Sequence, residues 1–181
     1  LTNYIVELGD SIKDSLLIIV SEDKKDIKLN LDAEINNKII SFLKNKFPYP
    51  ILSEEETKQL SFNNYEDKVW IVDPLDGSLN FSRGIPISCI SIALFNGGKH
   101  EFGCIYDFNR KELFVAEENN CILNKNKITT SNIKEKSKGI LCTGFPSWRN
   151  YENESLNIFL HQIKDWKKVR AIGSAALSLA W

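Results

Sequence analysis

Apolar residues recur every three or four positions in two stretches near the start of the chain, which is the spacing of amphipathic helices. The first stretch covers residues 3–20 and the second covers residues 31–47. Because proline cannot continue a helix, the second helix is predicted to stop before Pro48. Residues 21–28, most of which are charged, are predicted to form the loop between the two helices.

Further along the chain the pattern changes to short runs rich in β-branched and aromatic residues, which are typical of strands. These runs cover residues 70–72, 89–95, 102–108, 113–116 and 140–143. Residues 96–99 and 108–111 carry the turn signals of hairpins, which favours an antiparallel sheet. Helices are predicted again at residues 155–166 and from about Ser174. Helices packed on a largely antiparallel sheet define an α+β fold.

The composition fits a folded protein of 181 residues, with 43% hydrophobic and 26% charged residues. Lys plus Arg number 23 and Asp plus Glu number 24, so the net charge of −1 offers no basic surface for nucleic acid. The longest apolar run, residues 16–20, is too short to cross a membrane. We therefore expect neither a nucleic-acid partner nor a membrane partner. Because the chain contains no Met and ends inside an apparent helix, we also expect it to be part of a longer protein.

The four Cys residues contain no pair at CxxC spacing, and the chain has only two His residues. A zinc site or a disulfide framework is therefore not expected. Reduced thiols are usual in the cytoplasm, which is the location that the sequence predicts.

The densest group of polar residues follows the apolar run at residues 69–72. Asp73 is predicted to be the first residue to leave this strand, and Asp76 returns three positions later, with the carbonyl of Leu75 between them. Two carboxylates and a carbonyl on one tight turn are the hard oxygen ligands that Mg²⁺ prefers. The alternative is an ordinary Asp-Pro turn followed by a helix cap.

Gly77 would let the backbone of this turn approach a ligand closely. If a helix begins at Ser78, its free amides would face the same place and could hold a phosphate.

Three weaker signals accompany this turn, and each also has a purely structural explanation. The acidic residues 53–56 follow the short apolar pair 51–52 and could simply be a solvated surface. Asp32, in the first turn of the second helix, could serve simply to complement the helix dipole. Residues 173–176 (GSAA) at a strand-to-helix junction could be a close-packed cap or a loop that approaches a ligand.

Taken together and in this order, the four segments resemble the inositol monophosphatase family, the Mg²⁺-dependent and lithium-sensitive phosphomonoesterases related to fructose-1,6-bisphosphatase. The WIVDPLDGSLNF segment, residues 70–81, is the most specific part of the resemblance, which extends over the whole chain. It implies a layered helix and antiparallel-sheet architecture, with residues 1–150 as the N-terminal α+β domain. Residues 151–181 would begin a C-terminal α/β part that is largely missing from this chain.

The resemblance also implies a role for each matching residue. The metal ligands would be Glu55, Asp73, Asp76 and the carbonyl oxygen of Leu75, holding two or three Mg²⁺ ions. Asp32 and Ser78 would orient the attacking water as the catalytic pair. Substrate would contact Glu55, Leu75, Asp76, Gly77, Ser78, Gly173, Ser174 and Ala175.

The activity implied is hydrolysis of a phosphate monoester of a small polyol, sugar or nucleotide, by a homodimer. The family's third motif, a Trp-Asp pair whose Asp is a metal ligand, has no counterpart up to Trp181. We therefore expect a half-built site and little or no activity from the 181-residue chain itself. The alternative function is that of a catalytically incomplete family member or fragment with a binding role.

Overall fold

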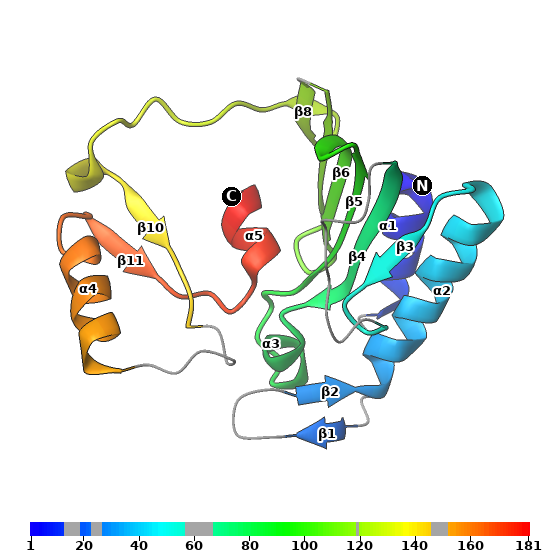
Figure 1. Ribbon diagram of the computed structural model, residues 1–181, viewed down its shortest axis with the longest axis horizontal. Helices are drawn as coiled ribbons and strands as arrows, with labels where there is room; N and C mark the ends of the chain where they lie inside the picture. Colours follow the sequence, from blue (N-terminus) through cyan, green and yellow to red (C-terminus); the bar gives the residue numbers. More distant parts are fainter. Residues whose placement is uncertain (13–18, 23–26, 57–66, 119, 146–151) are drawn as a thin grey trace.

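The computed structural model describes residues 1–12, 19–22, 27–56, 67–118, 120–145 and 152–181. Within them the main sheet has the strand order β3-β4-β5-β6-β7-β8-β9 (Figure 1). Its strands are β3 (Ile51–Ser53), β4 (Lys68–Asp76), β5 (Cys89–Asn96), β6 (Lys99–Asp107), β7 (Glu112–Glu117), β8 (Asn120–Leu123) and β9 (Asn126–Lys127). β3 runs parallel to β4, and every other neighbouring pair in this sheet is antiparallel.

Two helices, α1 (Thr2–Ile12) and α2 (Asn30–Lys46), cover one face of this sheet (Figure 1). Their apolar stripes are fully buried and meet the inward-facing residues of the central strands. The buried cluster includes Ile5, Ile12, Ile35, Ile39 and Leu43 from the helices and Val72, Ile90, Ile92 and Tyr106 from the strands. Removal of this apolar area from water is the main source of stability for the layer.

The opposite face of the sheet carries the short helix α5 (Ala175–Ala180), which packs against β5 and β6 (Figure 1). Leu177 is its fully buried anchor. Beside α5 lies a groove of about 620 Å³, lined by β5 to β8 and by Trp181. Another short helix, α3 (Ser78–Ser82), follows β4 directly.

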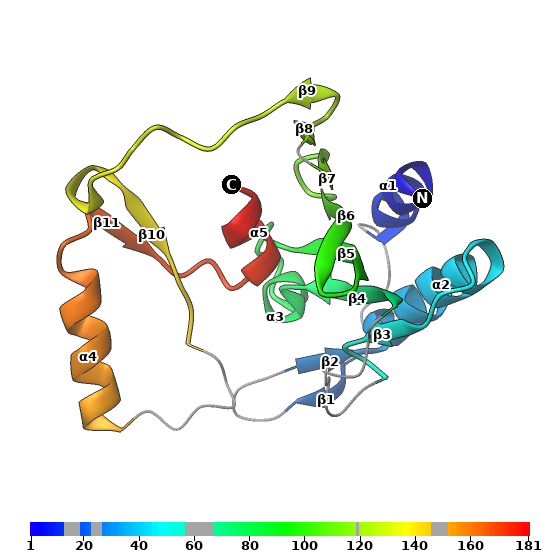
Figure 2. The ribbon, with the colours of Figure 1, turned by 45° about the horizontal axis from the view of Figure 1, so that its top comes forward.

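Two small sheets lie outside the main one (Figure 2). β1 (Ile19–Glu22) and β2 (Ile27–Leu29) pair antiparallel, and β2 leads into α2. β10 (Ile140–Cys142) and β11 (Lys168–Arg170) pair in parallel, and α4 (Asn153–Ile163) lies between them in the chain, with a single 3₁₀ turn at Lys136–Lys138 before β10.

The α+β class and the two hairpin turns are confirmed, and the second predicted helix is α2 with its end before Pro48. The prediction of a helix over residues 3–20 is wrong at its end, because α1 stops at Ile12 and residues 19–20 belong to β1. Residues 13–18 lie outside the described residues. The apolar run at 16–20 is rich in β-branched residues, which favour a strand over a helix.

Two further predictions need correction. The loop expected at 21–28 is largely a strand pair, since β1 and β2 leave only residues 23–26, which lie outside the described residues. Asp73 does not leave its strand, because β4 continues to Asp76 through an irregularity in its pairing with β5. β8, β9 and β11 were not anticipated from the sequence.

Candidate functional site

The two acidic segments meet because β3 and β4 are parallel neighbours. Ser53 pairs with Val72, so Glu54 and Asp73 follow at the same step of the two strands. The amide of Glu54 donates a hydrogen bond to the carbonyl of Val72 at 3.1 Å, which extends the ladder by one residue. The structure therefore brings the 53–56 turn against Asp73, and Glu54 is the residue that faces it.

Asp73 lies in an electrostatically unfavourable place for a carboxylate. Burial raises its pKa to about 8, and the negative charges of Glu54 and Asp76 act in the same direction. A hydrogen bond from the backbone of Leu75 opposes the rise without cancelling it. A shift of this size marks a carboxylate in a partly desolvated, negatively charged position, as is common at functional sites.

Asp76 joins this acidic group to the start of α5, about a hundred residues further along the chain. The Ser174 hydroxyl donates to Oδ2 of Asp76, and the Ala176 amide donates to the same oxygen at 2.8 Å. The amide of Ala175 donates to Oδ1 at 3.2 Å. The negative carboxylate thus satisfies amides at the positive end of α5, a favourable arrangement for both.

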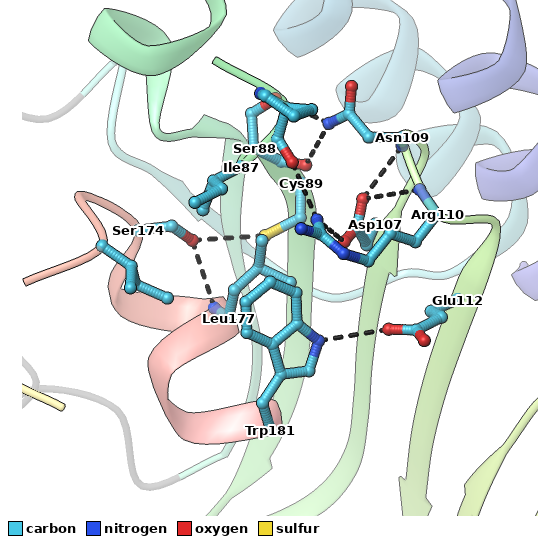
Figure 3. Close-up of polar contacts among 12 residues, drawn as sticks. Ile87, Ser88, Cys89, Asp107, Asn109, Arg110, Glu112, Ser174, Leu177 and Trp181 are labelled. Atoms are coloured by element: carbon cyan, nitrogen blue, oxygen red, sulfur yellow. Dashed lines mark hydrogen bonds and ion pairs between the residues drawn. The ribbon is translucent and has the colours of Figure 1, made fainter. Parts of the chain in front are cut away.

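Ser174 is the N-cap of α5, since its Oγ accepts a hydrogen bond from the Leu177 amide at 3.2 Å. Figure 3 shows its side chain directed toward β5, where the Cys89 sulfur lies 4.0 Å from Oγ. Cys89 also contacts Oδ2 of Asp76, at 3.7 Å. Burial and the charge of Asp76 raise the pKa of the Cys89 thiol, so this sulfur is a neutral donor and not a nucleophile.

Two glycines allow these turns to come together. Gly77 has φ of 86°, and a Cβ atom there would lie 2.7 Å from the carbonyl oxygen of Ile87. Gly173 has φ of 72°, and its Cβ would lie 2.9 Å from the side-chain nitrogen of Asn80. Both positions require the left-handed conformation and the missing side chain of glycine.

Asp32, the predicted partner of Ser78, is buried in the first turn of α2, with 4% exposure. One turn later, Asn36 accepts a hydrogen bond from the hydroxyl of Ser53 at 2.5 Å, which ties this helix to the end of β3. The β2 strand that leads into α2 packs beside α3, the helix that begins at Ser78. Direct or water-mediated contact between Asp32 and Ser78 stays a prediction.

The far end of α5 is held by the turn between β6 and β7 (Figure 3). The Trp181 indole donates to Glu112 at 3.1 Å, and the guanidinium of Arg110 lies 4.5 Å from the centre of its ring. Arg110 in turn forms a 3.0 Å ion pair with Asp107, whose side chain is fully buried. Nothing in the sequence pattern indicated this anchor.

Glu54, Asp73 and Asp76 form the donor set that a divalent cation would meet at this place. Across the described ranges, no group of three or more His, Cys, Asp or Glu side chains stands ready to hold a metal ion. The chemistry of the donors is nevertheless suitable, because Glu54, Asp73 and Asp76 offer only hard oxygen atoms. A cation among them would also relieve the repulsion that raises the pKa of Asp73.

Sequence reasoning missed two residues of this site. Glu54 received no role, although it is the acidic neighbour of Asp73; the assignment of Glu55 as a ligand stays a prediction. Asn80 was noted only as part of a motif, although its amide bonds to Ile172 across 92 positions of sequence. The left-handed Gly173 beside it is the signal that could have suggested a close contact.

Comparison with known proteins agrees with this architecture. The model of the inositol monophosphatase family matches residues 7–181. Among curated relatives, the Nus factor SuhB of Xylella fastidiosa is 34% identical over 168 residues, which cover 91% of this chain and 60% of the relative. The Nus factor SuhB of Vibrio cholerae is 34% identical over 158 residues, covering 86% of this chain and 59% of the relative.

Solved structures are similar over nearly the full chain. The suppressor protein SuhB from Bartonella henselae superposes with a TM-score of 0.82 and 27% identity, over 98% of this chain and 70% of that one. An IMPase from Thermotoga maritima superposes with a TM-score of 0.79 and 26% identity, over 98% of this chain and 68% of that one.

The fold and the family match together define an α+β protein with the architecture of the inositol monophosphatase family. The chain belongs to the inositol monophosphatase family. It spans about 60% of the length of the curated relatives it matches. None of the helices in the described part of the chain has the length and apolar character that a membrane crossing requires.

Proposed function

We propose that this chain carries the acidic half of a phosphatase site that hydrolyses a phosphate monoester of a small polyol, sugar or nucleotide with the help of Mg²⁺. The observation that supports this most directly is the contact of Glu54, the residue after β3, with Asp73 in the neighbouring strand β4. The negative charges of Glu54, Asp73 and Asp76 would repel a dianionic substrate unless cations were also present. Membership of the inositol monophosphatase family supports the same chemistry.

In this proposal the ions are held by the carboxylates of Asp73 and Asp76, the carbonyl oxygen of Leu75 and the acidic turn. Glu54 is the member of that turn that contacts Asp73, and Glu55 is the ligand that the sequence predicts. When bound, Mg²⁺ would lower the pKa of a water molecule and neutralise charge on the phosphate. Among the described residues no ready-made group of three or more such side chains is found, so the proposal depends on the donor chemistry and on the family.

The remaining roles fall to residues on the surrounding turns. Asp32 and Ser78 together orient the attacking water, with Asp32 as the proton acceptor. The backbone amides of Gly77 and Ser78 donate hydrogen bonds to the phosphate. The turn at residues 173–175 lines the pocket for the alcohol portion of the substrate.

The decisive experiment measures phosphate release from inositol monophosphates, sugar phosphates, fructose 1,6-bisphosphate and a 3′-phosphoadenosine nucleotide. It assays the protein that the gene encodes, in Mg²⁺ and in EDTA, and also the 181-residue chain where the gene encodes further residues. We expect release of phosphate in Mg²⁺ and none in EDTA. The variant Asp73→Asn should abolish release, whereas Glu101→Gln, which removes a surface carboxylate paired with Lys68, should not.

A second candidate function is suggested by the curated relatives, because each of the two is named Nus factor SuhB. In that case the chain would act by binding a partner, and the acidic site would be a remnant or a regulatory feature. A folded complete gene product that releases no phosphate from any of these compounds, with or without Mg²⁺, would favour this function over the first. The homodimer expected from the family stays a prediction in both cases.

A further inference from the structure

The side chain of Asn80 joins two segments that are far apart in the sequence. Its Nδ2 atom donates one hydrogen bond to the carbonyl of Ile87 at 2.9 Å and another to the carbonyl of Ile172 at 2.8 Å. Asn80 itself lies in α3, directly after the DPLDG turn. One amide group therefore ties α3 to the segment before β5 and to the segment before α5.

The contact with the second segment is close. The backbone of Gly173 packs on the Asn80 amide so tightly that a Cβ atom at Gly173 would lie 2.9 Å from Nδ2. A Cβ atom at Gly77 would in turn lie 3.4 Å from the carbonyl oxygen of Gly173. The two turns therefore meet backbone to backbone, with Asn80 beside the contact.

Asparagine suits this position for a specific chemical reason. Both groups that it faces are carbonyl oxygens, so the position needs two donors on one short side chain. An aspartate would direct a negatively charged oxygen at two acceptors, and an alanine would leave both carbonyls without this donor. Both bonds are partly buried, so water would replace the lost donor only incompletely.

The residues that follow Gly173 are those that bind Asp76. Ser174, Ala175 and Ala176 all donate hydrogen bonds to its carboxylate. The position of Ile172 and Gly173 decides whether these donors reach Asp76. Asn80 thus acts one step away from the acidic site and touches none of its carboxylates in the contacts described.

We propose that Asn80 is a positioning residue that holds the turn at residues 173–176 against Asp76 before any ligand binds. It fixes the distance between the acidic wall and the wall that receives the alcohol portion of the substrate. The structural part of this inference stands on the contacts above, and its effect on turnover rests on the proposed function. Preorganisation of this kind improves turnover by removing the need to order the site during the reaction.

The first test measures hydrogen–deuterium exchange of residues 172–178 in Asn80→Asp and Asn80→Ala. We expect exchange to be faster by about fivefold or more, which corresponds to about 1 kcal/mol, because each of the two partly buried hydrogen bonds contributes about this much. The control is Ser82→Ala, which removes a side-chain bond to the carbonyl of Leu79 in the same helix. Exchange that is unchanged in folded Asn80 variants would overturn the proposal.

Should Asn80→Asp and Asn80→Ala fail to fold, as judged by circular dichroism, Asn80→Ser supplies a milder change with one donor retained. It should raise exchange of residues 172–178 without affecting the β6–β7 hairpin. Equal acceleration across the whole chain would mean that Asn80 serves general stability, and would also overturn the proposal.

The second test measures turnover by the complete gene product well below its melting temperature. Asn80→Asp should lower kcat by about tenfold or more, Asn80→Ser should recover part of the loss, and Ser82→Ala should match wild type. The exchange experiment tests the role of Asn80, and the turnover experiment also tests the proposed function. A wild-type protein without activity would count against the proposed function while exchange still decides on Asn80, and an active enzyme with unchanged exchange in the variants would refute the role of Asn80 alone.

Discussion

The carboxylate of Glu54, the first residue after β3, faces the carboxylate of Asp73 in the parallel strand β4. The arrangement is produced by backbone pairing, since Ser53 is opposite Val72 and the Glu54 amide continues the ladder. It is unfavourable in itself, because burial and the neighbouring charges raise the pKa of Asp73 to about 8. Holding these two carboxylates in contact lowers the free energy of unfolding, and a bound proton or cation would relieve this electrostatic cost.

Replacing Asp73 by Asn should stabilise the protein in EDTA near pH 8. The raised pKa means that the folded state prefers the protonated side chain, so this group contributes most stability below its ordinary pKa of 3.8. That contribution is lost progressively as the pH rises toward about 8. Urea unfolding should therefore show Asp73→Asn to be more stable than wild type by about 1 kcal/mol or more at pH 8, and by less at pH 5.

With excess Mg²⁺ the order should reverse, since only the wild-type protein gains from binding the cation. A variant that is less stable than wild type at pH 8 in EDTA would show that the Asp73 carboxylate is structurally favourable. In that case Glu54 and Asp76 would not exert the net repulsion on Asp73 that its raised pKa implies.

Asp76→Asn should have the opposite effect in EDTA, although Asp76 belongs to the same motif. Its carboxylate accepts hydrogen bonds from Ser174, Ala175 and Ala176 at the positive end of α5. An amide keeps one acceptor oxygen but loses the charge, so the free energy of unfolding should fall by about 1 kcal/mol. Thermal unfolding of both variants in one buffer checks the contrast, and two shifts of the same sign would contradict it.

Ser78→Ala should lower turnover by the complete gene product roughly 10²-fold, the typical value of a positioned acid–base group. The concentration of Mg²⁺ needed for half-maximal activity should hardly change, because the hydroxyl is not proposed as a ligand. Ser78→Thr keeps the hydroxyl and should retain most activity. Parallel loss of turnover and Mg²⁺ dependence in Ser78→Ala would mean that Ser78 serves the structure of the turn.

Local patterns predicted the parts of the fold that local forces determine. Helix α2 follows from its apolar spacing and from Pro48, and the β5–β6 hairpin follows from its Asn-Gly-Gly turn. The same reasoning failed for residues 19–20, which belong to β1, because the apolar run that contains them fits either a helix or a strand. Whether such a run forms a helix or a strand depends on its pairing in the tertiary structure, which the spacing of apolar residues does not encode.

The candidate site was predictable as a set of segments and less so as a set of contacts. Three consecutive glutamates are chemically equivalent in the sequence, and only the register of β3 against β4 determines that Glu54 meets Asp73. Asn80 is a further example, because its role depends on Ile172, which is 92 positions away. Contacts of this range are set by the assembled layers, and no local motif reports them.

Gly77→Ala should be far more harmful than Gly84→Ala, even though both glycines have positive φ. Gly84 has φ of 68° and open space around it, so alanine there bears only the strain of the left-handed conformation, about 1–2 kcal/mol. Gly77 has a similar strain, and its Cβ would also lie 2.7 Å from the Ile87 carbonyl. Relief of that clash requires a backbone shift between Asp76 and the start of β5. Urea unfolding should show that Gly77→Ala lowers the free energy of unfolding by more than about 3 kcal/mol, and the variant should also lose phosphate release. Equal losses of stability in the two variants would show that the close approach of Gly77 to Ile87 is not a real constraint.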